Sequence, residues 1–128
     1  METFTLGDLT ARLDRTAPAV LRVHMTGKSA SREAGKVLAP LFDQALAAAR
    51  ADARTLELHF EQLEYFNSST IAALVQFIRA AQTAKIDLRV VYDRAQKWQA
   101  MSFDALKRAL KPFETGTGPT VQFVSPEG

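Results

Sequence analysis

The size and composition of the chain are those of one soluble globular domain. Its 128 residues, 47% hydrophobic and 23% charged, can bury a compact core without metal or disulfide staples. Cysteine is absent, which is compatible with the cytosol and excludes disulfides, thiolate zinc sites and thiol nucleophiles. The 16 basic and 14 acidic residues are mixed along the sequence, so we expect no nucleic-acid-binding surface. Because no stretch approaches the ~18 apolar residues of a membrane span, we expect a cytoplasmic protein without direct membrane insertion.

Alternation of apolar and polar residues predicts five strands, in the order 4–6, 19–25, 55–60, 86–92 and 121–123. The first is short and ends at the Gly7-Asp8 break, and the last is also short. The three longer strands each have one polar side, which carries Arg22, His24, Glu57, His59, Asp87 and Arg89.

Two apolar stripes at helical spacing predict helices between these strands. The first stripe consists of Val37, Leu38, Leu41, Phe42, Ala45, Leu46 and Ala49. Ser31 is its candidate N-cap, and Pro40 predicts that the helix either kinks or starts there. The second helix has Asn67 or Ser68 as its N-cap and runs to about Ala84, with a stripe of Ile71, Leu74, Val75, Ile78 and Ala81.

A third helical segment follows the 86–92 strand, and its capping signals predict that it is broken. Asp93 and Gln96 have the spacing of a capping box, and Ser102 is flanked by apolar residues as in a hydrophobic staple. We expect the segment to end before Pro112, with a turn-rich connector at 116–119.

This alternation of strands and helices is typical of an α/β domain. A sheet covered on both faces would have almost continuously apolar strands, whereas these strands have a polar side. We therefore predict a single domain over 1–128, with its core at about 19–124. It should contain a mixed sheet of four to five strands with helices mainly on one face.

The sequence lacks the glycine-rich phosphate loop, the Gly-x-Ser-x-Gly elbow and the paired helical histidines of common enzymes. His24 and His59 should approach each other on neighbouring strands, but two histidines without a third ligand make a poor metal site. Glu57, Glu61 and Glu64 are conceivable as acid and base, yet no pocket or partner is evident for them. We interpret all five as surface residues and expect neither catalysis nor a cofactor or metal.

The segment 63–71 is the most informative part of the chain, because four small polar residues follow two aromatic ones and lead into the second helix. Any one of the four can cap the helix, which accounts for one residue but not for four. A hydroxyl on a first helical turn is also a favourable place for a phosphate, since free N–H groups and the helix dipole stabilise negative charge there.

This segment resembles the hallmark of the STAS domains (sulphate transporter and anti-sigma factor antagonist). In that family a strand ends in a hydrophobic pair, which is followed by Asp-Ser-Ser or Asp-Ser-Thr and an amphipathic helix. The motif here reads Tyr65-Phe66-Asn67-Ser68-Ser69-Thr70. Residues 88–92 look like the next family strand and 95–103 like the next helix and its break, so the resemblance covers roughly 19–110.

Two positions depart from the family pattern: Asn67 replaces the usual acidic residue, and Thr70 replaces the usual glycine. The asparagine form is similar to a divergent branch of biofilm-regulating phosphoproteins. In that branch a Tyr-Asp pair follows the next strand, as Tyr92-Asp93 does here.

The resemblance implies a bacterial signal-transduction protein that acts by partner switching. Family knowledge maps the phosphorylated hydroxyl to Ser68 first and Ser69 second. The expected partners are a serine protein kinase or anti-sigma factor and a PP2C-type phosphatase, and the protein itself is expected to be a monomer or weak dimer. The residues expected to bind the partner are Tyr65, Phe66, Asn67, Thr70 and Trp98. The alternative is a constitutive STAS adaptor subunit of a transporter or signalling complex, without phosphorylation.

Overall fold

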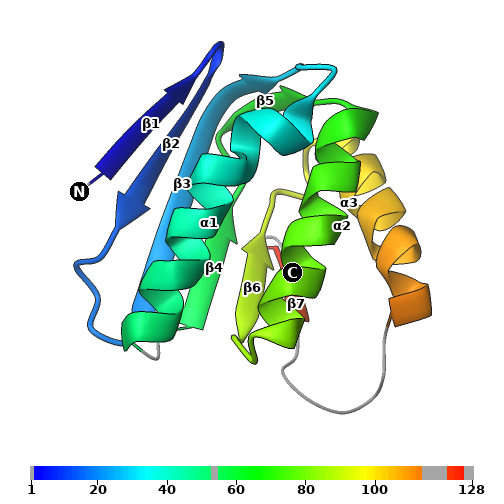
Figure 1. The fold of residues 1–128 in the computed structure, drawn as a ribbon. Helices are drawn as coiled ribbons and strands as arrows, with labels where there is room; N and C mark the ends of the chain where they lie inside the picture. Colours follow the sequence, from blue (N-terminus) through cyan, green and yellow to red (C-terminus); the bar gives the residue numbers. More distant parts are fainter. Residues whose placement is uncertain (1, 53–54, 114–120, 126–128) are drawn as a thin grey trace.

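A mixed sheet with helices packed on one face forms the domain (Figure 1). The computed structural model describes residues 2–52, 55–113 and 121–125. The predicted connector at 116–119 lies outside these residues.

The sheet has seven strands in the described part of the chain. They are β1 (Glu2–Leu6), β2 (Leu9–Asp14), β3 (Val20–Ser29), β4 (Thr55–His59), β5 (Leu63–Phe66), β6 (Leu88–Val91) and β7 (Val121–Val124). Their order in the sheet is β1-β2-β3-β4-β6-β7, and β5 pairs with the far end of β3. The pairs β1-β2 and β2-β3 are antiparallel, and all the others are parallel.

The helices of the described part are α1 (Ala34–Asp52), α2 (Ser68–Thr83) and α3 (Lys97–Leu110), and the short 3-10 turn η1 (Lys111–Phe113) follows α3. The predicted second helix is confirmed closely, and Asn67 is its N-cap. The first helix begins at Ala34, so Pro40 lies inside it and does not mark its start. Ser31 Oγ accepts a hydrogen bond from Glu33 N, so it caps the preceding turn instead of the helix.

All five predicted strands are present, but the expected count of four to five is too low. The prediction did not include β2, although Leu9, Ala11 and Leu13 alternate with polar residues there. The reason is that the Gly7-Asp8 break was interpreted as the end of the first strand region. The prediction also missed β5, whose four residues are too short for a clear alternation.

The prediction of a broken third helix is wrong. One buried stripe continues from Gln99 through Phe103 and Leu106 to Leu110. Ser102 lies within this helix and does not cap it. Asp93 is not the N-cap of a capping box, because the helix begins at Lys97 with Gln96 as its N-cap; the Asp93 carboxylate accepts a hydrogen bond from Ala95 N in the preceding turn.

The alternation in the strands separates a packed face from a helix-free face of the sheet. On β3, Leu21, Val23 and Met25 are buried, whereas the residues between them are partly exposed. The helices cover one face of the sheet, and the buried side chains of the strands form one core with the apolar stripes of these helices. The predicted one-sided cover of the sheet is confirmed.

Gly27 allows the turn between β1 and β2 to approach β3 closely. Its φ of +88° is in the left-handed region, and a Cβ there would collide with the Asp8 carbonyl. Gly27, Lys28 and Ser29 pair with β5, and the register of this pairing shifts between Gly27 and Lys28. This pairing positions β5, and therefore the start of α2.

Candidate functional site

The segment that resembles the STAS motif lies at one end of the sheet, where β5 ends and α2 begins. Figure 1 shows β5 and the first turns of α2 and α3 close together at this end. The chain passes from the strand residue Phe66 to the helix residue Ser68 through Asn67 alone. Asn67 is extended, with φ −101° and ψ 179°, as an N-cap requires.

Asn67 uses both ends of its side-chain amide. Its Oδ1 accepts hydrogen bonds from Thr70 N and from Thr70 Oγ1, each at 2.9 Å. Its Nδ2 donates to the Ser31 carbonyl at 2.9 Å. An aspartate could make the first set of contacts but has no proton to donate to Ser31.

The substitution Asn67→Asp is therefore expected to lower the free energy of unfolding by about 1–2 kcal/mol, although aspartate is an equally good N-cap. The loss comes from a carboxylate oxygen placed against the Ser31 carbonyl. Urea denaturation measures the change, and Asn67→Ala, which also loses the cap, should be less stable still. An Asn67→Asp protein as stable as the wild type would show that the bond to Ser31 contributes nothing in solution.

Thr70 is buried and serves the fold. Only 3% of the residue is exposed, and its Oγ1 lies 2.7 Å from Ser29 Oγ and 3.2 Å from the Ser29 carbonyl. Thr70 thus joins the start of α2 to the end of β3. The expectation that Thr70 contacts a partner is corrected, because its side chain has no free surface.

Ser69 ties the first turns of two helices together. Its Oγ accepts a hydrogen bond from Ala34 N at 3.0 Å and donates one to the Arg32 carbonyl at 3.0 Å. Ala34 is the first residue of α1, so the Ser69 hydroxyl satisfies a main-chain donor that the helix itself leaves free. A phosphate on Ser69 would replace the hydroxyl proton and so remove the hydrogen bond to the Arg32 carbonyl.

Ser68 differs from its three neighbours. It is exposed, it is the first residue of α2, and its hydroxyl makes no hydrogen bond within the described part of the chain. A group attached to Ser68 Oγ would lie beside the positive end of the helix dipole. Of the four polar side chains, Ser68 is the one that can be modified without loss of a contact.

The aromatic residues near this turn divide between core and surface. Phe66 is 3% exposed and packs edge-on against Trp98, with ring centroids 5.5 Å apart. Its expected role in partner binding is therefore corrected to a role in the core. Tyr65 is 46% exposed, and Trp98 is half-buried with its Nε1 donating to Gln96 Oε1 at 3.2 Å. Met101, which is 72% exposed on α3, was not predicted; its one signal is that it stands outside the buried stripe of α3.

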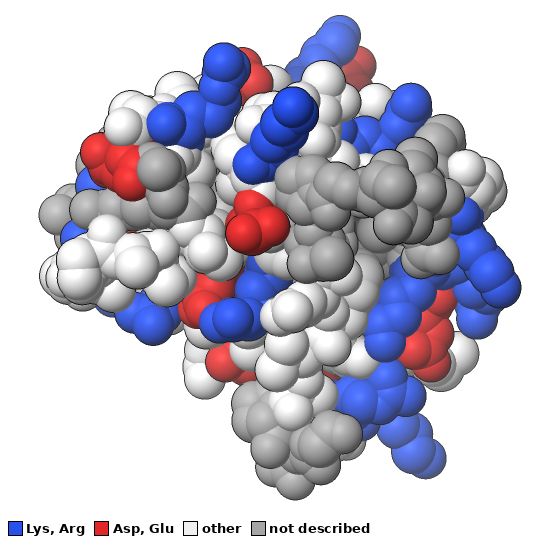
Figure 2. All heavy atoms as spheres, turned by 90° about the horizontal axis from the view of Figure 1, so that it is seen from below, with Lys and Arg blue, Asp and Glu red and all other residues white. Residues whose placement is uncertain are grey.

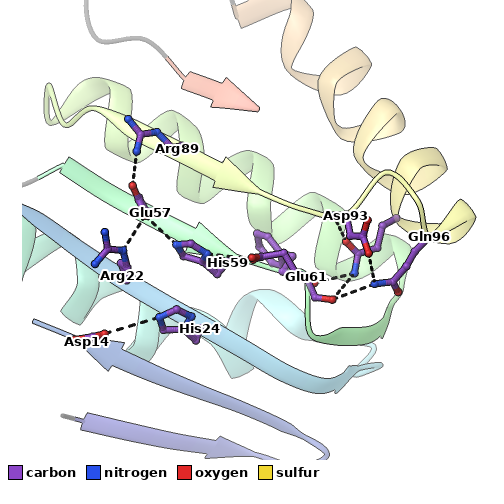
Figure 3. A network of polar contacts seen from close by, with 11 residues as sticks. Asp14, Arg22, His24, Glu57, His59, Glu61, Arg89, Asp93 and Gln96 are labelled. Carbon is purple, nitrogen blue, oxygen red and sulfur yellow. Dashed lines mark hydrogen bonds and ion pairs between the residues drawn. The ribbon is translucent and has the colours of Figure 1, made fainter. Parts of the chain in front are cut away.

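A second polar cluster lies on the helix-free face of the sheet (Figure 3). Glu57, on the central strand β4, is only 5% exposed, so its interpretation as a surface residue is wrong. Its carboxylate accepts hydrogen bonds from Arg22 Nε at 3.1 Å, from His59 Nε2 at 2.9 Å and from Arg89 Nη1. Glu64 is exposed, as expected.

The environment of Glu57 keeps it ionised. Burial alone would raise the pKa of Glu57, but hydrogen bonds from His59 and Arg22, together with the charges of His59 and Arg89, outweigh it. The net effect is a pKa below the ordinary value for a glutamate. Glu57 is therefore the negative centre of a structural ion-pair cluster and not a proton donor.

No metal-binding group of three or more His, Asp or Glu side chains occurs among the described residues. None of the helices in residues 2–52 and 55–113 is long and apolar enough to cross a membrane. Figure 2, the view from below, shows Lys and Arg side chains spread over this face of the molecule with Asp and Glu side chains among them.

The chain matches no protein-family model, and no curated protein sequence matches it significantly. Solved structures do match. An anti-sigma factor antagonist from Mycobacterium paratuberculosis has a TM-score of 0.58 at 17% identity, covering 93% of this chain and 90% of that one. The anti-sigma factor antagonist SpoIIAA in its unphosphorylated form has a TM-score of 0.54 at 14% identity, covering 91% of each chain.

A third match is an uncharacterised protein of the DUF3478 family from Shewanella loihica PV-4, which has a SpoIIAA-like fold. Its TM-score is 0.53 at 14% identity, and the match covers 97% of this chain and 91% of that one. At these identities the likeness establishes the fold alone. The chain has the SpoIIAA-like fold of anti-sigma factor antagonists, as the resemblance of its sequence to STAS domains predicts.

Proposed function

We propose that this protein is a phosphorylation-controlled interaction switch that resembles an anti-sigma factor antagonist and carries its phosphate on Ser68. The observation that supports this most is the difference between Ser68 and its three polar neighbours at the start of α2. Asn67, Ser69 and Thr70 hold the turn together, while the Ser68 hydroxyl is exposed and makes no contact within the described residues. The turn thus presents one exposed hydroxyl, while its other three polar side chains are held by hydrogen bonds.

The first turn of a helix suits both states of such a switch. Phosphorylation adds about −1.5 to −2 charge at pH 7, and the free N–H groups and dipole of α2 stabilise that charge without a change in the fold. A partner docked on the same turn meets the phosphate as a source of repulsion and of desolvation cost. Tyr65 and Trp98, which flank the turn, are the proposed apolar contacts of the partner.

The partner is proposed to be a serine protein kinase or anti-sigma factor, which phosphorylates Ser68 and then releases the protein. A PP2C-type phosphatase would restore the unmodified form. The protein acts in the cytoplasm, as a monomer or weak dimer, and catalyses no reaction itself.

Intact-mass spectrometry after incubation with ATP and candidate serine kinases tests the proposal. The wild type should gain the mass of one phosphate, and Ser68→Ala should gain none. Ser69→Ala is the matched control, because it removes the neighbouring hydroxyl and should still be phosphorylated. Loss of phosphate from Ser69→Ala with retention in Ser68→Ala would move the site to Ser69.

A constitutive adaptor is the second candidate function. Asn67 and Thr70 favour it, since they differ from the family pattern and are fully used in hydrogen bonds of the fold. An adaptor would gain no phosphate from any kinase and would bind its transporter or signalling partner equally well when Ser68 is replaced by alanine.

A further inference from the structure

Two histidines from neighbouring strands are stacked on the helix-free face of the sheet (Figure 3). His24 of β3 and His59 of β4 are direct partners in the parallel register. Their ring centroids are 4.7 Å apart, with 30° between the ring planes. These are the only two histidines of the chain, so each titration can be followed separately.

The ring of His59 lies between two glutamate carboxylates. Its Nε2 lies 2.9 Å from Glu57 Oε1, and its Nδ1 lies 3.1 Å from Glu61 Oε1. An ionised carboxylate only accepts hydrogen bonds, so both ring nitrogens must carry a proton to satisfy both contacts.

The environment of His24, in contrast, disfavours its charged form. Its side chain is 32% exposed, and its nearest carboxylate oxygen, Asp14 Oδ2, is 4.0 Å from Nε2. Burial, followed by the positive charges of His59 and Arg12, lowers the pKa of His24, and the carboxylates of Asp14 and Glu61 only partly offset this. The charged and titratable groups that face the pair from its own and the flanking elements are Arg12, Asp14, Arg22, Glu57, Glu61 and Arg89.

We propose that this stack is an acid-responsive element, in which protonation of His24 places a second positive charge against His59 and separates the two rings. This separation loosens the contacts that His59 makes with the β4–β5 connection, residues 60–62. Two like charges at this separation repel each other. Glu61 is the part of the connection that moves with His59, because its carboxylate is bonded to the ring.

Glu61 also links the connection to the start of α3. Its main-chain carbonyl accepts a hydrogen bond from Gln96 Nε2 at 3.1 Å, and Gln96 Oε1 accepts one from Trp98 Nε1 at 3.2 Å. A shift of Glu61 is thereby transmitted to the indole of Trp98, the single tryptophan of the chain. The inference does not depend on phosphorylation of Ser68, and its failure would leave the proposed function untouched.

The sign of the pH effect follows from the direction of the shift. The pKa of His24 in the folded protein is below the 6.5 of an unperturbed histidine, so the unfolded chain takes up the proton first as the pH falls. The contribution of neutral His24 to stability is complete above about pH 6.5 and is lost as the pH falls through the lowered pKa.

NMR titration of the histidine side chains and of the Trp98 indole N–H tests the inference. In the wild type His24 should titrate with a midpoint below pH 6.5, and the indole resonance should shift with the same midpoint. In His59→Gln the His24 midpoint should move upward, because the neighbouring positive charge is gone. In His24→Asn the indole shift should disappear, with circular dichroism verifying that the variant is folded.

Glu61→Ala separates a relay through the connection from a general loosening of the protein. In this variant His24 should still titrate, while the indole no longer follows it. Glu64→Ala, which removes an exposed glutamate from the adjoining strand, is the matched control and should behave like the wild type. Any one of three results would overturn the inference. The first is an indole shift that persists in His24→Asn or in Glu61→Ala. The others are an indole resonance that does not respond to pH in the wild type, and a His24 midpoint at or above pH 6.5.

Discussion

Phosphorylated on Ser68, the protein is expected to bind its partner about a hundredfold more weakly than the unmodified protein does. A penalty of about 3 kcal/mol, from repulsion and desolvation of the phosphate in the docked interface, corresponds to that ratio. Isothermal titration calorimetry with the separated phosphorylated and unmodified forms measures it. The fold should not change, because the phosphate lies on an exposed residue whose hydroxyl makes no contact in the described part of the chain.

Two variants of Ser68 serve as comparisons for this affinity measurement. Ser68→Ala should bind as tightly as the unmodified wild type, since the hydroxyl has no structural role to lose. Ser68→Glu should fall between the two forms, because it carries less charge than a phosphate. Equal affinities of the phosphorylated and unmodified forms would remove the switch and favour the adaptor.

Glu57→Ala is expected to lower the free energy of unfolding by about 3 kcal/mol. The substitution leaves His59, Arg22 and Arg89 without the carboxylate that they share, on a strand with neighbours on both sides. The two arginines are partly exposed, at 36% and 42% of their side chains, so water limits the loss. Urea denaturation measures the change.

The control for this prediction is Glu64→Ala, which removes an exposed glutamate and should change stability by no more than about 0.5 kcal/mol. Glu57→Gln keeps the shape of the side chain and should be less damaging than alanine. A Glu57→Ala protein of wild-type stability would contradict the view that the ion-pair cluster holds the helix-free face together.

The sequence predicted the layers of the fold because they depend on periodicity. The polar sides of the strands that contain His24, His59 and Arg89 correctly indicated a sheet with helices on one face. The predicted interruption of the third helix was wrong. Residues that favour N-caps, such as Ser102, also occur inside helices when a continuous buried stripe holds the helix together.

At the site, the sequence marked the right segment but could not assign roles within it. Ser69 and Asn67 bond to groups of the 31–34 segment, which is 35 to 37 residues earlier in the chain, and Thr70 bonds to Ser29, which is 41 residues earlier. Only the paired ends of β3 and β5 bring these groups together. Local sequence therefore shows four candidate hydroxyl and amide groups, and tertiary contacts leave one of them free.

The burial of Glu57 escaped prediction for a similar reason. Alternation places Glu57 on the polar side of its strand but does not reveal that β4 lies between β3 and β6. Its arginine partners are 35 and 32 residues away and come from these two flanking strands. The pairing of opposite charges becomes visible only when the strand order is known.

Phosphosite mapping of the native protein, isolated from its own cells and fragmented in a mass spectrometer, tests the central claim most directly. The proposed switch predicts a phosphate on Ser68 in a fraction of the molecules that changes with growth conditions. A phosphate found only on Ser69, Thr70 or elsewhere, or none under any condition, would contradict the assignment of Ser68 as the regulated group.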